Sequence, residues 1–216
     1  MVELSAIPLL ACLSEETRQR TVVLRRYQAG DLVFRQDEPT TGLWVVCEGR
    51  VAMERVGAGG NLATVGLWVP GDVVGIAGLW DGSGYPASAR ALDTPTTLGW
   101  MERRVVLDLH QKVPAFGMQI SRMLAERLRS VQELAAHRAG RPLGQQLAAV
   151  LVMLDRRMGP ELRLTHEDLA HMLGSHRETI SRLLSEFARR GWIEGGYGAL
   201  RVRDPKGLGA FAGFES

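Results

Sequence analysis

The sequence predicts an α+β fold in three parts: an N-terminal β-roll of the jelly-roll type, one long helix, and a C-terminal winged helix-turn-helix. Short apolar runs repeat about every ten residues in the first half of the chain. A helical stripe follows them, and then two short helices around a glycine turn precede a glycine-rich hairpin. We expect the three parts to cover residues 1–112, 113–137 and 138–216.

Length and composition are those of an ordinary globular protein. The chain has 216 residues, of which 45% are hydrophobic and 23% charged, and its net charge is +2. No apolar run reaches the roughly 18–20 residues of a membrane span. The N-terminus also lacks the basic start of a secretory signal, so we expect a cytoplasmic protein with no membrane partner. Cys12 and Cys47 are too few for a disulfide framework or an iron–sulfur cluster within one chain.

The first part has the pattern of many short antiparallel strands. Ser14 is suited to cap a short helix before them, because two glutamates follow it. From about residue 25, apolar runs alternate with turns such as Gly30-Asp31 and Gly71-Asp72, a pattern typical of a barrel or jelly roll. The expected strands cover residues 31–35, 42–47, 49–55, 62–69, 72–79, 87–92 and 96–101.

A helical stripe follows the roll. Its members are spaced by four and three residues in turn, which places them on one face of a helix. Such a face packs either on its own domain or on the same helix of a second subunit. The helix-turn-helix described next favours a homodimer, because proteins with this motif bind paired half-sites as dimers. The predicted dimer interface consists of Ile120, Leu124, Arg127, Val131 and Leu134.

Residues 164–184 carry the most specific local pattern. Thr165 is suited to cap a helix, with Asp168 at its third position. Gly174 is placed for the left-handed turn that closes this helix. Ser175 is predicted to cap the next helix, with Glu178 in capping-box spacing. Two short helices joined by a tight turn form a helix-turn-helix. Its buried faces are expected to hold Leu169, Ala170, Leu173, Ile180, Leu183, Leu184 and Phe187.

The second of these helices presents a polar face in its N-terminal half, the part that enters the major groove in this motif. Arg177 and Arg182 can each donate two hydrogen bonds to guanine, and Glu178 can accept one from cytosine. Thr179 or Ser181 is suited to hold a phosphate. Taken singly, these residues also fit a solvated face with a Glu178–Arg182 pair. The combination of cap, glycine turn and Arg-Glu-Thr-x-x-Arg favours recognition of double-stranded DNA.

A glycine-rich hairpin over residues 191–202 is typical of a wing that lies along the DNA backbone. Tyr197 at its tip is equally suited to donate to a phosphate or to serve as a turn residue. Residues 138–216 contain 12 basic and 9 acidic side chains, so the excess of positive charge lies in this part of the chain.

Nearly the whole chain resembles the cyclic AMP receptor protein/FNR (CRP/FNR) family of transcription regulators. Gly71–Trp80 looks like the family segment Gly-Asp-x-x-Gly-Glu-x-x-Leu-Phe, and Ser175–Arg182 is similar to the recognition helix of its Arg-Glu-Thr-x-x-Arg members. The resemblance implies a cyclic-nucleotide-binding-like roll, a homodimer, an inverted repeat of TGTGA-like half-sites, and a contact with RNA polymerase near residues 156–162. By this resemblance, bases are read by Arg177, Glu178 and Arg182, and phosphates are held at His176 and Thr179. The full set of predicted phosphate contacts is Thr165, His176, Thr179, Ser181 and Tyr197.

The roll departs from family members that bind cyclic AMP. Ile76 stands where they carry glutamate for the ribose hydroxyl, and Pro86-Ala87 stands where they carry Arg-Ser for the cyclic phosphate. Arg90 follows, but in the wrong order. The helix positions that touch adenine hold Val131 and Gln132. An anionic phosphate without a paired arginine loses its main charge-assisted bonds, so we predict no useful binding of cyclic nucleotides.

Other sensors of the family need residues that this chain lacks. The iron–sulfur members need an N-terminal cysteine cluster, and a haem sensor usually needs a histidine in the roll, whereas all five histidines here lie beyond the predicted strands. We predict no cofactor and no metal. An unidentified small molecule, control by protein abundance, or constitutive DNA binding remain. We favour effector-independent binding; the alternative is a roll that senses a small molecule, or a redox signal through Cys12 or Cys47.

Two other classes of protein fit less well. A cupin-type metal enzyme needs histidines and carboxylates on the roll strands. His166 and His171 lie five residues apart, not the four of a zincin helix. The sequence has no nucleophile elbow and no phosphate-binding loop, so we predict that the protein is not an enzyme. A signalling protein that has lost DNA binding is disfavoured by the intact Arg177, Glu178 and Arg182.

Overall fold

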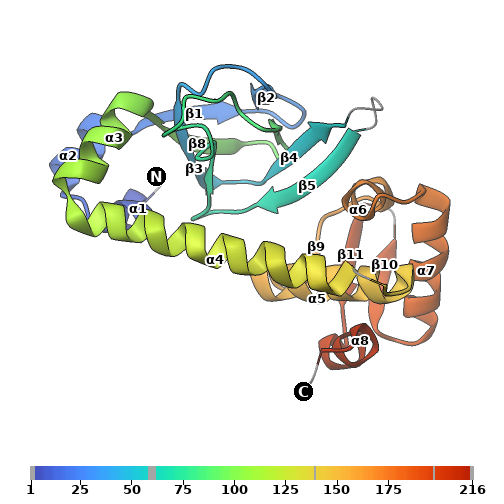
Figure 1. Ribbon diagram of the computed structural model, residues 1–216. Helices are drawn as coiled ribbons and strands as arrows, with labels where there is room; N and C mark the ends of the chain where they lie inside the picture. The colour runs from blue at the N-terminus through green and yellow to red at the C-terminus, as the bar shows by residue number, and fades with distance from the viewer. Residues whose placement is uncertain (1–2, 58–61, 139, 197, 215–216) are drawn as a thin grey trace. The chain divides into compact units, whose positions relative to one another are not determined.

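The computed structural model describes residues 3–57, 62–138, 140–196 and 198–214, without the side chains of residues 133–138 and 196. The chain divides into two units, Met1–Arg127 and Leu128–Ser216, which are treated one at a time (Figure 1). In the described part of the chain, no helix is long and apolar enough to cross a membrane.

The first unit begins and ends with helices. A 3₁₀ turn (Leu4–Ala6), α1 (Pro8–Ala11) and α2 (Glu15–Thr21) precede the strands. Ser14 caps α2 as predicted, because its hydroxyl accepts the N–H of Thr17 at 3.2 Å. After the strands come α3 (Arg103–Lys112), which the sequence analysis did not anticipate, and α4 (Pro114–Arg138), which runs into the second unit.

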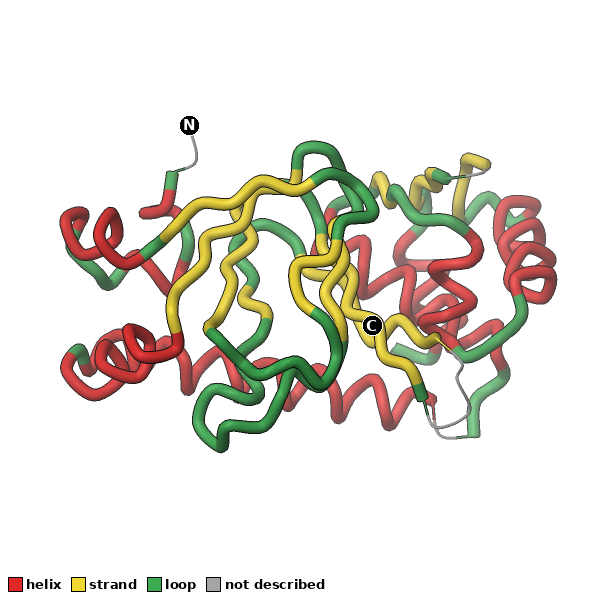
Figure 2. The backbone as a smooth tube through the Cα atoms, turned by 90° about the horizontal axis from the view of Figure 1, so that it is seen from above, coloured by secondary structure: helices red, strands yellow, loops and turns green. Residues whose placement is uncertain are grey.

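Two four-stranded antiparallel sheets form the predicted roll (Figure 2). One has the strand order β1-β8-β3-β6 and the other β2-β7-β4-β5. Each expected strand is present, but the 72–79 segment forms only a two-residue strand, and the first strand was not predicted. The strands are β1 (Val23–Tyr27), β2 (Leu32–Phe34), β3 (Gly42–Glu48), β4 (Val51–Val56), β5 (Leu62–Trp68), β6 (Val73–Val74), β7 (Ser88–Ala91) and β8 (Thr96–Glu102).

Strand β3 is buried on both faces and separates two apolar clusters. Leu43 and Val45 point into a cluster shared with α1, α3 and the first turns of α4. Trp44 and Val46 point the opposite way, into a cluster to which both sheets contribute. This second cluster is rich in aromatic side chains: the rings of Phe34 and Tyr85 are stacked, with their centroids 3.8 Å apart. Period-two alternation along a strand explains how one segment supplies both clusters.

The second unit contains a helical core and a small sheet. Its elements are α5 (Leu143–Met158), β9 (Glu161–Leu162), α6 (His166–Leu173), α7 (Arg177–Arg189), β10 (Ile193–Gly196), β11 (Ala199–Val202) and α8 (Pro205–Ala212). The strands pair in the antiparallel order β10-β11-β9. The segment expected to contact RNA polymerase, 156–162, is not a single loop, because α5 continues to Met158 and β9 begins at Glu161. Helix α8 was not predicted from the sequence, and it packs against α5.

Candidate nucleic-acid interface

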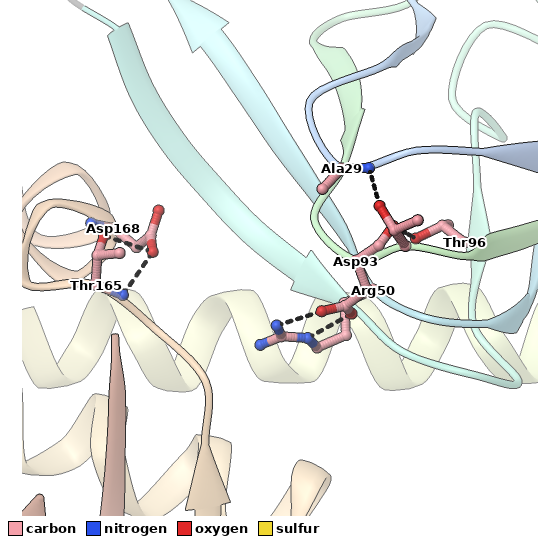
Figure 3. Close-up of polar contacts among 7 residues, drawn as sticks. Ala29, Arg50, Asp93, Thr96, Thr165 and Asp168 are labelled. Carbon is pink, nitrogen blue, oxygen red and sulfur yellow. Dashed lines mark hydrogen bonds and ion pairs between the residues drawn. The ribbon is translucent and has the colours of Figure 1, made fainter. Parts of the chain in front are cut away.

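Helix α6 begins with the capping box that the sequence predicts. The hydroxyl of Thr165 accepts the N–H of Asp168 at 3.1 Å. In return, the Asp168 carboxylate accepts the N–H and the O–H of Thr165, both at 2.7 Å (Figure 3). These bonds satisfy backbone donors that a helix start leaves open. The hydroxyl proton of Thr165 is therefore donated within the protein, and the geometry gives this residue a capping role; its contact with a phosphate stays a prediction.

The turn between α6 and α7 requires its glycine. Gly174 has φ +61°, in the left-handed region that glycine adopts without strain, and its N–H donates to the carbonyl of Ala170. The N–H of Ser175 donates to the same carbonyl at 3.0 Å. The prediction that Ser175 caps α7 is wrong: the N-cap is His176, with no side-chain capping bond. The bond to Ala170 places Ser175 in the turn, one residue before the N-cap His176.

Helix α7 has an apolar, buried face and a charged, exposed face. Ile180, Leu184 and Phe187 are buried in the second unit. Arg177, Glu178 and Arg182, the predicted base-reading residues, are all exposed in the N-terminal half of the helix. Further along the same side, Ser185 and Arg189 are also exposed. Within the described residues no ion pair joins Glu178 to Arg182, although i,i+4 spacing allows one. The guanidinium and carboxylate groups that the sequence assigned to base reading therefore face outward together.

A hydrogen bond that the sequence did not reveal links the two helices of the motif. His166, the first residue of α6, has its Nδ1 2.8 Å from the Oγ of Ser181 on α7. Both side chains are half-buried. The two residues lie 15 positions apart, so no helical periodicity connects them. Of the remaining predicted phosphate contacts on this motif, His176 is exposed and Thr179 is half-buried.

The wing is a tight hairpin. Gly196 pairs with Ala199 at the end of the β10–β11 register. Gly195 has φ +115°, and a Cβ there would lie 2.6 Å from the carbonyl oxygen of Ala199, so only glycine fits. The predicted contact Tyr197 lies outside the described residues. Ion pairs Arg201–Glu161 and Arg203–Glu194 flank the strands.

Helix α4 keeps only part of the predicted dimer stripe at the surface. Ile120 is 1% exposed and belongs to the apolar cluster of its own unit. It has no surface left for a partner, so its prediction as an interface residue is wrong. Leu124 and Val131 are 41% and 58% exposed. The guanidinium of Arg127 lies 4.6 Å from the centroid of the Trp68 ring, on β5. The predicted interface side chain Leu134 lies outside the described side chains.

The roll residues that stand at the expected ribose and cyclic-phosphate positions include two buried apolar side chains. Ile76 is buried in one apolar cluster and Ala87 in the other. The guanidinium of Arg90 is paired with Glu54 at 2.9 Å and also donates to the carbonyl of Gly30 at 2.8 Å. Arg50 is held in the same manner by Asp93, at 2.7 Å (Figure 3). Both guanidinium groups are thus neutralised within the protein.

The two thiols lie in environments that favour the neutral form. Burial raises the pKa of the Cys47 thiol to about 11, and burial also raises the pKa of Cys12. Both cysteines are reduced and half-buried. Among the described residues, no group of three or more histidine, cysteine or carboxylate side chains is arranged to hold a metal ion.

Comparisons with known proteins agree with this architecture. A model of the cyclic nucleotide-binding domain matches residues 24–113, and a model of the Crp-like helix-turn-helix domain matches residues 145–211. The chain is 31% identical over 192 residues to the HTH-type transcriptional regulator Cmr of Mycobacterium tuberculosis, covering 89% of this chain and 77% of the relative. It is also 31% identical over 181 residues to the cyclic AMP receptor protein of Thermus thermophilus, covering 83% of each chain.

Solved structures give the same result. A CRP-family transcriptional regulator from Thermus thermophilus superposes with a TM-score of 0.73 at 26% identity, covering 88% of this chain and 96% of the other. Both domains and their order along the chain are therefore shared with known transcription regulators. The chain belongs to the cyclic AMP receptor protein/FNR family of transcription regulators.

Proposed function

We propose that this regulator binds double-stranded DNA in the cytoplasm as a homodimer, at an inverted repeat of TGTGA-like half-sites, and does so without cyclic AMP. The observation that carries base reading is the face of α7. Arg177, Glu178 and Arg182 are exposed together, while Ile180 and the apolar residues behind it anchor the helix. Arginine forks match guanine, and a carboxylate matches cytosine, in the major groove.

Phosphate contacts would fix the register of this helix on the duplex. His176 is exposed at the start of α7, and Thr179 lies one turn along on the same helix. A helix N-terminus adds its own favourable field for an anion. Tyr197 in the wing remains a proposed contact. Such contacts position the protein and carry no sequence information by themselves.

Dimerisation is supported by the apolar surface of α4. Leu124, Leu128 and Val131 are spaced by four and three residues and are all exposed. A row of large aliphatic side chains at this spacing on a 25-residue helix is typical of a helix that pairs with another. We infer that these three residues, with Leu134, form the core of the pairing. A dimer places two copies of α7 on the two half-sites of an inverted repeat.

Independence from cyclic nucleotides is supported by the interior of the roll. Arg90, which follows the expected phosphate-binding positions in the sequence, is already paired with Glu54. A buried isoleucine, Ile76, cannot accept the ribose hydroxyls. Removing Arg90 from Glu54 would leave a half-buried carboxylate unpaired, which is costly. Activation or repression would then depend on where the protein binds and on a contact with RNA polymerase near Arg156–Leu162.

An effector-dependent regulator is the second candidate, and one cleft supports it. A cavity of about 650 Å³ in the first unit is lined by α1, by the turn before β6 and by α4. Arg122 and Gln119 give it a polar side, and Leu9 and Pro70 an apolar one. Redox sensing by Cys47 is disfavoured, because its raised pKa leaves little reactive thiolate near neutral pH.

Selection of bound sequences from a random duplex pool tests the proposal. The purified protein would be used without ligand and at a stated salt concentration, because phosphate contacts make affinity salt-dependent. Enrichment of an inverted repeat supports a dimeric, ligand-independent reader. The same selection with cyclic AMP, and then with a cell-extract metabolite fraction, identifies the second candidate: a repeat that appears only with an added compound would contradict effector independence.

A further inference from the structure

The hydroxyl of Ser181 is bonded differently from those of two other helical serines, Ser121 and Ser185. Ser121 and Ser185 donate to the carbonyl four residues earlier, at 3.1 and 2.9 Å, which is the usual arrangement inside a helix. Ser181 instead reaches from α7 to the imidazole of His166 on α6, at 2.8 Å. The bond is made at one ring nitrogen only. Among the described residues, Nε2 of His166 has no partner.

The direction of this bond sets where the neutral imidazole carries its proton, because the hydroxyl can either donate to Nδ1 or accept from it. When the Ser181 hydroxyl donates to Nδ1, the neutral ring must carry its hydrogen on Nε2. When the ring is protonated, Nδ1–H donates to the hydroxyl and Nε2 again carries a hydrogen. In these two states Nε2–H is a hydrogen-bond donor, whereas a neutral ring with its hydrogen on Nδ1 would leave Nε2 an acceptor. Phosphate oxygens accept hydrogen bonds, so a bound phosphate selects the states that carry Nε2–H.

Nε2 of His166 lies at the start of α6, where the neighbouring acidic side chains are bonded to other groups. The acids of the first turn are both engaged: Asp168 caps the helix, and Glu167 lies 3.3 Å from Nε2 of His171, one turn further along. The backbone N–H groups of the first turn add a field that favours an anion. Arg163 also precedes this helix end.

We propose that His166 is a DNA phosphate contact, made through its Nε2–H, and that Ser181 is a positioning residue that orients the ring and sets its proton. The inference rests on the proposed DNA-binding function. It revises the interpretation of Ser181 as a phosphate contact, because the serine acts through the histidine. It also couples the two helices of the motif, because the His166–Ser181 hydrogen bond links the phosphate contact on α6 to the base-reading helix α7.

Full-length variants test the contact on two probes, a duplex with the selected repeat and a scrambled duplex of equal length, by fluorescence anisotropy at fixed salt. His166→Ala is expected to weaken both by about five- to tenfold and leave their ratio unchanged, because a phosphate contact is sequence-independent. Ser181→Ala should weaken both less, and should add nothing to His166→Ala. Ser181→Thr, which keeps the hydroxyl, should restore affinity. His171→Ala and Ser185→Ala are the matched controls, expected to have no effect.

Single methylphosphonate substitutions along the selected duplex then locate the contact. One position should weaken the wild type and have no effect on His166→Ala. Absence of such a position, or losses for His166→Ala and Ser181→Ala that simply add, would overturn the inference even if melting temperatures change. Failure of the proposed function is a separate result, read from the wild type alone as no preference for the selected duplex over the scrambled one.

Discussion

Arg50 and Arg90 of the roll and the charged residues in the N-terminal half of α7 are placed in opposite ways. In the roll, Arg90 pairs with Glu54 and Arg50 pairs with Asp93, and the guanidinium of Arg25 lies over the rings of two tryptophans. On α7, Glu178 and Arg182 are exposed and form no ion pair with each other. A charge already paired within the protein must lose that partner to bind a ligand, and an exposed one need only lose water. The comparison favours binding by the helix and a structural role for Arg25, Arg50 and Arg90.

The largest expected effect is on DNA binding by α7. The double variant Arg177→Ala, Arg182→Ala should lose about 2–6 kcal/mol per half-site, at roughly 1–3 kcal/mol for each bidentate base contact, and should lose its preference for the selected sequence. Its unfolding free energy should change little, because both side chains are exposed. Anisotropy titrations on selected and scrambled duplexes measure the affinity and the preference, and urea titrations measure the stability.

The matched control for that pair is Arg189→Ala, which removes one positive charge from the last turn of the same helix. It should weaken binding to all sequences slightly and leave the preference intact. If the double variant also weakens both duplexes equally, Arg177 and Arg182 touch only the backbone, and the comparison between the two regions loses its main support.

The next effect is on the stability of the roll. Tyr85 is buried, its ring stacks on Phe34, and its hydroxyl donates to the carbonyl of Gly42 at 3.0 Å. Tyr85→Ala should cost about 3–5 kcal/mol of unfolding free energy in urea titrations, as do other large aromatic truncations. Tyr85→Phe keeps the stacked ring and should cost only about 1 kcal/mol. A small loss for the alanine variant would show that the roll interior is not packed as a structural core.

A smaller effect is expected at the cap of α6. Thr165→Ala removes the capping oxygen and should cost about 1 kcal/mol of unfolding free energy. Thr165→Ser keeps the hydroxyl and should be close to wild type. The DNA affinity of the alanine variant should fall no more than its loss of folded protein explains. A larger fall in affinity at full folding would restore Thr165 as a phosphate contact.

The smallest effect is chemical, at Cys47. The pKa of this thiol is raised from 9.0 to about 11 by burial, so the folded state favours the neutral form. Its contribution to stability is present below pH 9 and decreases as the pH rises toward 11. In a Cys12→Ala background, iodoacetamide should label Cys47 more slowly in the folded than in the denatured protein at about pH 7.5, because the thiolate is the reactive form. Faster labelling of the folded protein would revive the redox alternative.

Local sequence signals were sufficient for most of the second unit. The capping box at Thr165, the left-handed Gly174 and the apolar stripe of α7 each depend on residues within a few positions of one another. The face that a helix presents to solvent follows from its 3.6-residue period, so the exposure of Arg177, Glu178 and Arg182 was predictable. The prediction of Ser175 as the cap was wrong because the adjacent residue, His176, takes the N-cap position. The N–H of Ser175 is instead bonded to the carbonyl of Ala170 in the turn.

What the sequence alone determined, therefore, is the order of the parts, the strand spacing of the roll and the charged face of the reading helix. Only the tertiary structure decided which residues far apart in the chain meet. Strand β1 became visible through its pairing with β8, some seventy residues away. Ile120 is buried in the apolar cluster of its own unit instead of lying on the exposed stripe of α4. Arg90 forms an ion pair with Glu54, and Ser181 is hydrogen-bonded to His166. Hydrophobic periodicity records which face of an element is covered but not by what, and contacts between distant segments depend on that second fact.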